Sequence, residues 1–402
     1  MKQLPKCPVS EVCGGCQLQH LSYDKQLQLK QQRVEKALGC FAPVEKIDGM
    51  EWPYNYRNKV QISYGLDDRK RIIAGNYVTS THTIVPVSEC QLASETANAI
   101  FRTITALVKS FKLSVFDENA MQGFLRHVLV RTSCDSEEVM VVLVTGSPVF
   151  PKKNDFIKAL CSKHKNIVTV VQNINRRHTS MILGDRNIVL FGKGYIHDEL
   201  CGYEFLVSPQ SFYQVNHSQT EKLYNYAITM ADLKGDERVL DAYCGVGTIG
   251  IIASSKAGHV DGVEINNQAI KDAVKNAKMN EVKNISFYCA DAGRFMREKA
   301  AKKEKYDVVI MDPPRSGSDT AFLSSVVKLA PEKVVYISCN YLTQKRDLNY
   351  LTKHGYTVDK IQPVDMFPMT EHVETVCCLY HQKKDFISVP YEPKDDDYLK
   401  NR

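Results

Sequence analysis

The feature that most constrains the fold is a regular alternation of strands and helices from about residue 205 onward. A strand, a glycine-rich turn and a helix come first, in "ERVLDAYCGVGTIGIIASSKA". The same scheme follows in "HVDGVEINNQAIKDAVKNAKMN", "ISFYCADAGRFMREKA", "YDVVIMDPPRSG", "VVYISCN" and "YTVDKIQPVDMFP". Strands that alternate with helices predict a doubly wound parallel sheet, which binds ligands beyond the carboxyl ends of its strands. We therefore expect an α/β, Rossmann-like domain over residues 205–385.

A different pattern precedes this domain, from about residue 55 to residue 205. Short alternating segments separated by Gly, Asp, Asn and Lys predict strands, and residues 94–111 and 154–164 have the spacing of helices. Residues 21–40 also carry apolar side chains at helical spacing. The predicted strands read "NKVQISYG", "RIIAGNYV", "LRHVLVRT", "EEVMVVLVT", "NIVTVVQNIN" and "NIVLFGKG". We expect a central α+β domain over residues 21–204, mostly antiparallel and without internal repeats.

Composition limits the class of protein. A chain of 402 residues is long enough for two or three domains, and 44% apolar with 24% charged residues is typical of soluble globular proteins. There is no apolar run long enough to span a membrane and no signal peptide, so we expect a cytoplasmic protein. We also expect it to be a monomer. A net charge of +6 is compatible with a polyanionic partner without requiring one. Residues 386–402 are expected to form a frayed surface tail.

The glycine-rich turn "DAYCGVGTIG" suggests a nucleotide-like ligand. Gly245, Gly247 and Gly250 satisfy the pattern G-x-G-x-x-G, in which glycine lets the backbone approach a ligand and turn into a helix. Glu264 ends the next strand, where a carboxylate can accept a hydrogen bond from a ribose hydroxyl. This pattern fits an NAD-dependent oxidoreductase as well as an enzyme that uses S-adenosyl-L-methionine (SAM).

The sequence "VVIMDPPRSG" favours the second interpretation. Asp312 and two prolines stand at the carboxyl end of a strand, and the prolines predict a rigid, open loop at the ligand cleft. A transferase that holds a base beside a methyl donor needs such a loop, although a plain turn would look the same. Enzymes that methylate amino groups usually place an aromatic residue after the prolines, where this chain has Arg315. Another target atom is therefore indicated.

Cys339 and Glu374 could supply the chemistry for carbon-5 of a uracil. This carbon becomes nucleophilic when a thiolate adds to carbon-6, and a base must afterwards remove the carbon-5 proton. Cys339 ends the strand "VVYIS", and Glu374 lies one strand further on with His372, which would share its face on an extended segment. Taken singly, one of thirteen cysteines is more often a packed thiol, and a lone glutamate is more often a surface carboxylate.

Taken together, five motifs resemble the RNA (uracil-5-)-methyltransferase family of SAM-dependent enzymes. They are "SFYQVN" (211–216), "DAYCGVGTIG" (241–250), "MDPPRSG" (311–317), "YISCN" (336–340) and "HVETV" (372–376). The resemblance implies Cys339 as the nucleophile and Glu374 as the base. It further implies that Gln214 and Asp312 contact the target base. Cofactor-binding residues would be Gln214, Tyr243, Gly245, Gly247, Glu264 and Asp312.

Three cysteines near the N-terminus, Cys7, Cys13 and Cys16, indicate a metal site within residues 1–20. A redox pair is disfavoured because no βαβ pattern surrounds them, whereas zinc is a rival if His20 completes the ligand set. Many members of the family hold a 4Fe–4S cluster with three such cysteines and a later fourth, which Cys90 matches best. The resemblance therefore implies a 4Fe–4S cluster on four thiolates, with a structural role.

The RNA substrate is the least constrained part of the prediction. Several members of the family carry a small β-barrel RNA-binding (TRAM) domain before the cysteine motif. Because the motif here begins at Cys7, we expect no such domain, and RNA selection by the central domain and the cleft. We expect 23S rRNA as the substrate, with tRNA as the alternative. A non-catalytic RNA-binding protein with a structural metal is a further alternative, but it would have no need of Cys339.

Overall fold

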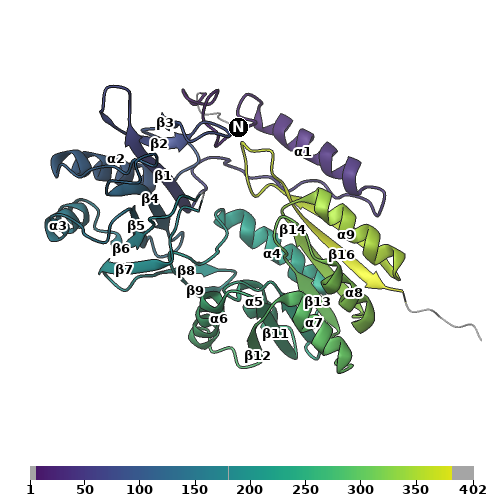
Figure 1. The fold of residues 1–402 in the computed structure, drawn as a ribbon. Coiled ribbons are helices and arrows are strands. Elements are labelled where there is room, and N and C mark those ends of the chain that lie inside the picture. The colour runs from purple at the N-terminus through teal and green to yellow at the C-terminus, as the bar shows by residue number, and fades with distance from the viewer. Residues whose placement is uncertain (1–5, 180, 383–402) are drawn as a thin grey trace, which may run out of the picture.

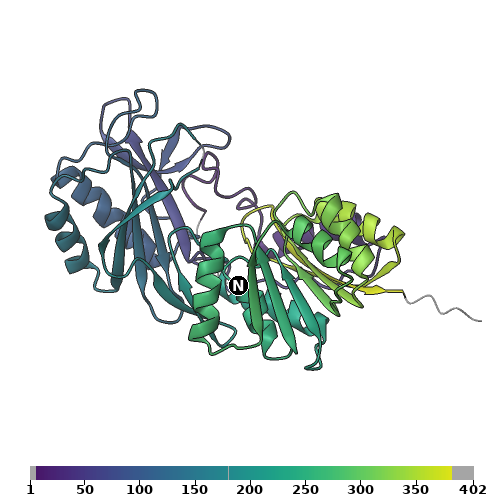
Figure 2. The same ribbon diagram turned by 60° about the horizontal axis from the view of Figure 1, so that its bottom comes forward.

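Two seven-stranded sheets organise residues 6–179 and 181–382, the part of the chain that this computed structural model describes (Figures 1 and 2). The strands of the first sheet are β1 (Lys59–Leu66), β2 (Ile72–Tyr77), β3 (Ile84–Pro86), β4 (Leu125–Thr132), β5 (Val139–Thr145), β6 (Ile167–Ile174) and β7 (Arg186–Phe191). They lie in the order β3-β2-β1-β4-β5-β6-β7, and every neighbouring pair is antiparallel except β5 and β6. The predicted, mostly antiparallel sheet is confirmed, and the three-residue strand β3 was not predicted.

Helices α2 (Glu95–Ser110) and α3 (Lys153–Lys163), both predicted from the sequence, pack against this sheet. Helix α2 begins after Ser94, whose side chain accepts a hydrogen bond from the backbone N–H of Ala97 at 3.2 Å, a typical N-cap. Every residue of β5 is buried, because α2 and α3 cover one face of the strand and an apolar cluster shared with the C-terminal half of the chain covers the other. Helix α3 connects β5 to β6, which allows this pair to run parallel.

The second sheet forms the core of the C-terminal lobe. Its strands are β10 (Arg238–Ala242), β11 (His259–Glu264), β12 (Ile285–Cys289), β13 (Val308–Met311), β14 (Lys333–Ser338), β15 (Tyr356–Val364) and β16 (Glu374–His381). They lie in the order β12-β11-β10-β13-β14-β16-β15. The first five strands in this order are parallel, as predicted, but β16 runs antiparallel to both β14 and β15. The expectation of a wholly parallel sheet was therefore wrong at this edge, because β15 and β16 form a hairpin that inserts its second strand beside β14.

Helices cover both faces of this sheet, as in a Rossmann-like domain. They are α4 (His217–Ala231), α5 (Thr248–Ser254), α6 (Asn267–Met279), α7 (Ala292–Ala301), α8 (Thr320–Leu329), α9 (Tyr341–Lys353) and α1 (Tyr23–Leu38). Apolar residues of α4, α5 and α6 pack on one face, and those of α1, α7, α8 and α9 pack on the other. The chain leaves β10 for β11 on one side and later returns to β13 on the other. This reversal creates the crevice in which sheets of this kind bind ligands.

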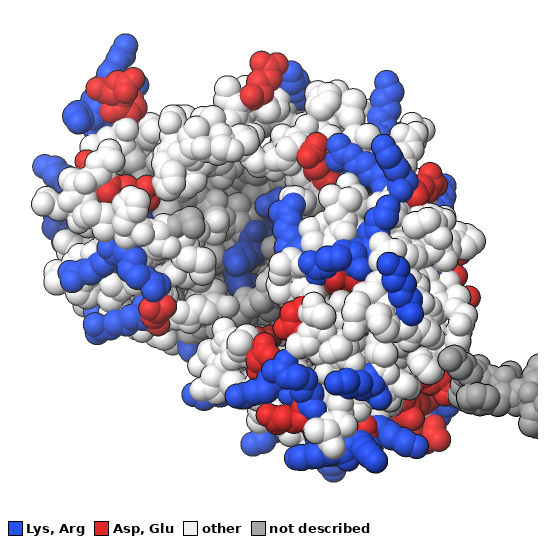
Figure 3. Space-filling model, turned by 45° about the vertical axis from the view of Figure 1, so that its right-hand side comes forward, with Lys and Arg blue, Asp and Glu red and all other residues white. Residues whose placement is uncertain are grey.

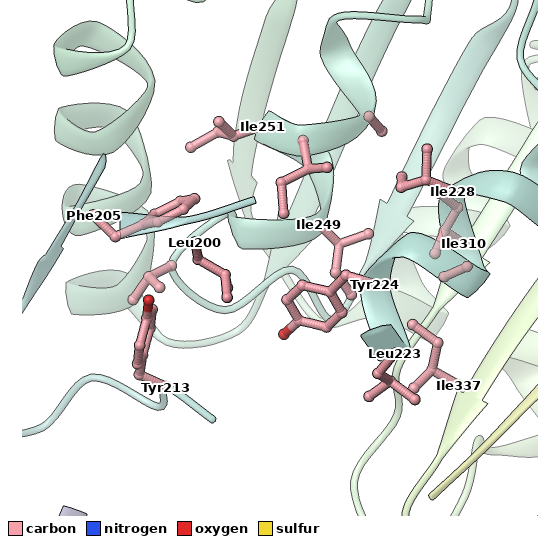
Figure 4. Packing of buried hydrophobic residues seen from close by; sticks show 14 of the residues in the cluster. Leu200, Phe205, Tyr213, Leu223, Tyr224, Ile228, Ile249, Ile251, Ile310 and Ile337 are labelled. Carbon is pink, nitrogen blue, oxygen red and sulfur yellow. The ribbon is translucent and has the colours of Figure 1, made fainter. Parts of the chain in front are cut away.

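One apolar cluster spans both lobes and fixes their arrangement. It combines Leu129 and Val142 of the first sheet with Ile310 and Ile337 of the second. Between them lies the hairpin of β8 (Ile196–Leu200) and β9 (Tyr203–Val207), which was not predicted. Figure 4 shows part of this cluster, including side chains from the hairpin, α4 and α5. Both lobes therefore share a continuous core.

Helix α1 lies on the C-terminal lobe, beside α9 (Figure 1). The sequence pattern had grouped it with the central region, within residues 21–204, and had placed a boundary at 204/205, inside β9. The packing of Val34, Ala37 and Leu38 instead joins α1 to the core of the second sheet. The predicted tail, residues 386–402, lies outside the described residues. Within the described residues, no helix has both the length and the apolar character needed to cross a membrane.

Candidate active site

A cavity of about 670 Å³ lies at the carboxyl ends of β10, β11, β13 and β14. The segment 211–216, which precedes α4, and the first residue of β16 complete its wall. All of the predicted catalytic and cofactor-binding residues except Gly247 line it, namely Gln214, Tyr243, Gly245, Glu264, Asp312, Cys339 and Glu374. The structure therefore brings together residues that are up to 160 positions apart in the sequence.

The glycine-rich turn has the conformation that the sequence predicted. Gly247 has a φ of 83° and caps α5, and a Cβ atom there would lie 2.9 Å from the ring of Phe287. Gly247 therefore allows the turn to form but faces Phe287, which explains why it does not line the cavity. Gly245, with a φ of 56°, does line it, and its N–H donates to the Glu264 carboxylate at 3.3 Å. The same carboxylate accepts from the N–H of Asn266 at 2.8 Å, so two hydrogen bonds hold Glu264 at the cavity wall.

Two carboxyl groups near the crevice between β10 and β13 have raised pKa values. Burial raises the pKa of Asp312, in the "DPPR" motif, to about 7. Burial also raises the pKa of Asp241 to about 8, although the N–H of Gly250 donates to its carboxylate at 2.7 Å. Asp312 therefore lies on the cavity wall with a carboxyl group that can gain or lose a proton near neutral pH.

Cys339 and Glu374 lie on neighbouring strands. Strands β14 and β16 pair with Ser338 opposite Thr375, so the next residues in the register, Cys339 and Glu374, face each other at the cavity. Burial, followed by the carboxyl groups of Glu374 and Asp312, raises the pKa of the Cys339 thiol to about 11, while the Arg315 guanidinium acts in the opposite direction and lowers it. Glu374 is 3% exposed, and burial, followed by the nearby Asp312, raises its pKa well above the ordinary value. A thiol and a basic carboxylate therefore share one wall of the cavity.

His372 does not share the position of Glu374, contrary to the sequence expectation. Strand β16 begins at Glu374, so His372 precedes the strand and does not line the cavity. Its ring nitrogen Nδ1 lies 3.3 Å from the Arg315 guanidinium, which does line the cavity. Burial, and then the charge of Arg315, lowers the pKa of His372, so a neutral ring can accept a hydrogen bond from the guanidinium.

The cavity wall also includes Asp291, Phe212 and Tyr224, which were not predicted as site residues. Asp291 follows β12 and caps α7, so it stands at the carboxyl end of a strand, as Glu264 does. The rule that identified Glu264 could have identified it as well. Phe212 is 68% exposed, which is unusual for a large apolar side chain. Its position in the motif "SFYQVN" could have identified it as a site residue. Tyr224 comes from α4 and lies near Ile249 (Figure 4), and no sequence pattern marked it.

The four predicted metal-binding cysteines line a second cavity, of about 340 Å³. They are Cys7, Cys13, Cys16 and Cys90. Burial, followed by the neighbouring Cys90, raises the pKa of Cys16 to about 12. In residues 6–179 and 181–382, no three His, Cys, Asp or Glu side chains are grouped as ligands of a metal ion. His20 is exposed and lies outside this cavity, which disfavours the zinc set that includes it.

The two cavities lie on either side of the segment 211–216. Gln214 lines the larger cavity and Val215 lines the smaller one. Asn58 holds this segment through hydrogen bonds to the carbonyl of Gln214 at 3.1 Å and from its own N–H to the carbonyl of Val215 at 2.9 Å. Figure 3 shows a hollow between the lobes with Lys and Arg side chains inside it. The smaller cavity, which Arg57 and Lys59 also line, is therefore cationic as well as rich in cysteine.

Comparison with known proteins agrees with this architecture. A family model described as "tRNA (Uracil-5-)-methyltransferase" matches residues 22–383. An "uncharacterized RNA methyltransferase" of Clostridium tetani is 43% identical, over 94% of this chain and 84% of its own length. A Staphylococcus aureus protein of the same description is 41% identical, over 92% of this chain and 83% of its own length.

A solved structure extends the likeness to the whole fold. It is the Pyrococcus abyssi tRNA (uracil-54, C5)-methyltransferase in complex with S-adenosyl-L-homocysteine. The two chains are 29% identical with a TM-score of 0.76, and the match covers 94% of this chain and 88% of the other. The alternatives of an NAD-dependent oxidoreductase and of a non-catalytic RNA-binding protein are thereby set aside. The chain belongs to the tRNA (uracil-5-)-methyltransferase family and is a SAM-dependent RNA methyltransferase.

Proposed function

We propose that this enzyme methylates carbon-5 of one uridine in RNA through a covalent bond between Cys339 and carbon-6 of the base. The observation that carries the proposal is the pairing of β14 with β16, which sets Cys339 and Glu374 face to face on the cavity wall. A nucleophile and a base are both needed for this chemistry, and both must reach the same ring.

The proposed reaction begins when the Cys339 thiolate forms a bond to carbon-6. The electron pair of the carbon-5–carbon-6 double bond moves to carbon-5, which then forms a bond to the methyl group. When SAM is bound, it supplies this methyl group and leaves as S-adenosylhomocysteine. Glu374 then removes the carbon-5 proton, the double bond forms again and the bond between carbon-6 and sulfur breaks. The products are 5-methyluridine, a protonated Glu374 and a free Cys339 thiolate, so atoms and electrons balance.

The electrostatics of the cavity fit these roles. Burial raises the pKa of Glu374, which makes its carboxylate a stronger proton acceptor than an exposed glutamate. The raised pKa of Cys339 keeps it mostly as a thiol at neutral pH, and Arg315 is the cation that favours its thiolate. Little of Cys339 is therefore a reactive thiolate at neutral pH, and Arg315 increases the fraction that is.

The cofactor subsite in this proposal lies at the glycine-rich turn. Glu264 and Asp291 stand at the ends of successive strands and can accept hydrogen bonds from ribose hydroxyls and from an adenine amino group. Tyr243 lines the same cavity, and its ring can pack against the adenosyl group. The carboxylates of Glu264 and Asp291 on the wall also favour a cationic sulfonium.

The target base in this proposal is flipped out of its RNA stack and enters the cavity between the lobes. Gln214, 8% exposed, and Asp312 have side chains that can hydrogen-bond the edge of a uracil. We propose 23S rRNA as the substrate, recognised mainly by the α+β lobe built on the first sheet, strands β1 to β7. A second candidate is tRNA, which the likeness to the Pyrococcus abyssi enzyme favours. We further propose that the enzyme acts in the cytoplasm as a monomer.

A 4Fe–4S cluster is proposed for the smaller cavity. Its four cysteines come from two separate parts of the chain and line one space, and four thiolates are the ligand set that such a cluster requires. The irons of a cluster keep its ligands farther apart than a single metal ion does, which is compatible with cysteines that are not grouped around one point. The backbone already ties this segment to the first sheet, since the N–H of Gly14 donates to the carbonyl of Tyr77 at 3.0 Å. The proposed role of the cluster is to strengthen this attachment.

The function is tested by incubating the purified enzyme with methyl-labelled SAM and, separately, with 23S rRNA and tRNA that lack 5-methyluridine. Labelled 5-methyluridine is expected in one RNA, and mapping the modified position identifies the substrate. Label in both RNAs at one position each would indicate dual specificity. No labelled 5-methyluridine in either RNA would contradict the proposed reaction.

A further inference from the structure

The segment that leads into Glu374 is held from outside the catalytic sheet. We define the base segment as residues 365–373, which connect β15 to β16 and end immediately before Glu374. Asp365, Met366 and Met369 are each at most 2% exposed, although this is a turn between two strands. Met369 has a φ of 68°, a backbone conformation that a methionine rarely adopts without support from its neighbours.

Helix α1 supplies this support through three buried polar side chains. The Tyr23 hydroxyl donates to the Asp365 carboxylate at 2.9 Å, and Gln26 and Lys30 make the other contacts. The Gln26 side-chain oxygen accepts a hydrogen bond from the N–H of Met369 at 2.9 Å. The Lys30 ammonium donates to the Asp365 carboxylate at 2.6 Å and to the carbonyl of Phe367 at 3.0 Å. Both Gln26 and Lys30 are 0% exposed. These contacts join positions more than 330 residues apart in the sequence, so they hold the base segment in one place from a separate element.

Residues close to the cysteine-lined cavity make further contacts with the base segment. The N–H of Leu18 donates to the carbonyl of Met369 at 3.0 Å, and the Tyr56 hydroxyl donates to the carbonyl of Pro368 at 3.0 Å. Met369 packs in a small apolar cluster with Tyr56, against which Cys16 and Cys90 also pack. The base segment is therefore held by α1 on one side and by Leu18 and Tyr56 on another, and Asn216, which caps α4, also donates to the carbonyl of Met366 at 3.0 Å.

We infer that Gln26 and Lys30 are positioning residues for Glu374. The inference rests on the proposed role of Glu374 as the base. Strand pairing to β14 and β15 fixes the backbone of Glu374 on its C-terminal side, whereas the base segment alone fixes it on its N-terminal side. A buried ion pair such as Lys30–Asp365 contributes less to folding stability than apolar packing does. Because its geometry is directional, however, it favours one conformation of the base segment. A displacement of about 1 Å of a catalytic group can lower a rate by on the order of 100-fold.

The same segment also holds the other group that acts on Cys339. His372 lies near its end and contacts the Arg315 guanidinium, which favours the Cys339 thiolate. Displacement of the base segment would therefore move the base and loosen Arg315 together, while the glycine-rich turn, on the far side of β13, keeps its contacts. The inference thus separates catalysis from cofactor binding, which gives the test its main readout.

The test compares Gln26→Met with Gln28→Met. Methionine is similar in size to glutamine but cannot accept the hydrogen bond from Met369, and Gln28 is an exposed residue on the same helix. Gln26→Met is expected to lower kcat by on the order of 10- to 100-fold and to accumulate methylated RNA still bonded to the protein, because proton removal is slowed. The affinity for SAM and the KM for RNA are expected to stay within about twofold of wild type, and Gln28→Met should behave as wild type.

A second pair, Lys30→Met with the exposed control Lys36→Met, gives an independent measurement. The same kcat loss and the same adduct are expected for Lys30→Met, with SAM affinity reporting whether it is folded. The inference is overturned if folded Gln26→Met keeps the wild-type kcat, or if its kcat falls without accumulation of the adduct. The wild-type enzyme separates the two hypotheses. If it forms no 5-methyluridine, the proposed function fails, whereas a wild type that is active beside an unaffected Gln26→Met contradicts only the positioning role.

Discussion

Cys339 and Glu374 stand opposite each other across β14 and β16, one residue beyond the paired Ser338 and Thr375. The two side chains reach the same cavity although they come from strands of opposite direction. In a wholly parallel sheet, the residues that follow neighbouring strands also meet at one edge, but there both would lie at carboxyl ends. Here the antiparallel β16 places its first residue, Glu374, opposite Cys339, the residue that follows the carboxyl end of β14.

The first prediction concerns the nucleophile. Cys339→Ala is expected to lower the turnover number by on the order of 10⁴-fold or more, because the other thiol on the cavity wall, Cys244, is buried, which raises its pKa well above the ordinary value, and it does not face Glu374. SAM binding, measured by calorimetry, should be unchanged, since the glycine-rich turn is intact. The exposed Cys40 provides the matched control, and Cys40→Ala should keep full activity. Methylation by Cys339→Ala at more than about one hundredth of the wild-type rate would contradict this role.

The second prediction concerns the base. Glu374→Gln should still form the bond to carbon-6 and accept the methyl group, but it cannot remove the carbon-5 proton. A slowly migrating RNA–protein band on a denaturing gel is expected, with turnover lowered by about 10²- to 10⁴-fold. Glu371, an exposed glutamate in the base segment, gives the control Glu371→Gln, which should show no such band. Normal turnover by Glu374→Gln would assign the proton removal to another group.

The third prediction concerns pH. The pKa of Cys339 is raised to about 11, so the thiolate fraction, and with it the rate of adduct formation in a single turnover, should rise with pH over the neutral range. Arg315 lowers this pKa, so Arg315→Met should raise it and slow adduct formation by about tenfold for each unit of increase. Higher pH should restore part of the loss. The exposed Arg294→Met is the control, and a pH profile of Arg315→Met identical to that of wild type would exclude an effect of Arg315 on the thiol.

The fourth prediction concerns the cysteine-lined cavity. Anaerobically purified protein should be brown, with absorbance at about 400 nm, and iron analysis should give about four irons per chain. Cys16→Ser should lose the colour and lower the melting temperature, because Cys16 would be one of the ligands. Cys134, which lies outside the cavity, gives the control Cys134→Ser, expected to keep both. Stoichiometric zinc and no iron in the wild-type protein would contradict the cluster.

How far the sequence alone predicts the site depends on the range of each interaction. Cys339 and Asp312 could be located because strand ends are local features, and parallel strands bring them to one edge. The antiparallel register of Glu374 was not predictable, because it depends on a hairpin that inserts into the sheet. The place of α1 was also misjudged, since the apolar spacing shows which face of a helix is buried but not which lobe covers it. The contact of Lys30 with Asp365 joins distant parts of the chain, so no local sequence pattern predicts it.

The central claim is that Cys339 bonds to carbon-6 of the target uracil. It is tested most directly with wild-type enzyme, SAM and substrate RNA that carries 5-fluorouridine in place of uridine. Glu374 cannot remove fluorine as it removes a proton, so the covalent product should persist. After digestion, mass spectrometry is expected to find a methylated fluorouridine on the peptide that contains Cys339 and on no other cysteine peptide. An adduct on a different residue, or complete absence of an adduct from RNA that is methylated when unsubstituted, would contradict the account.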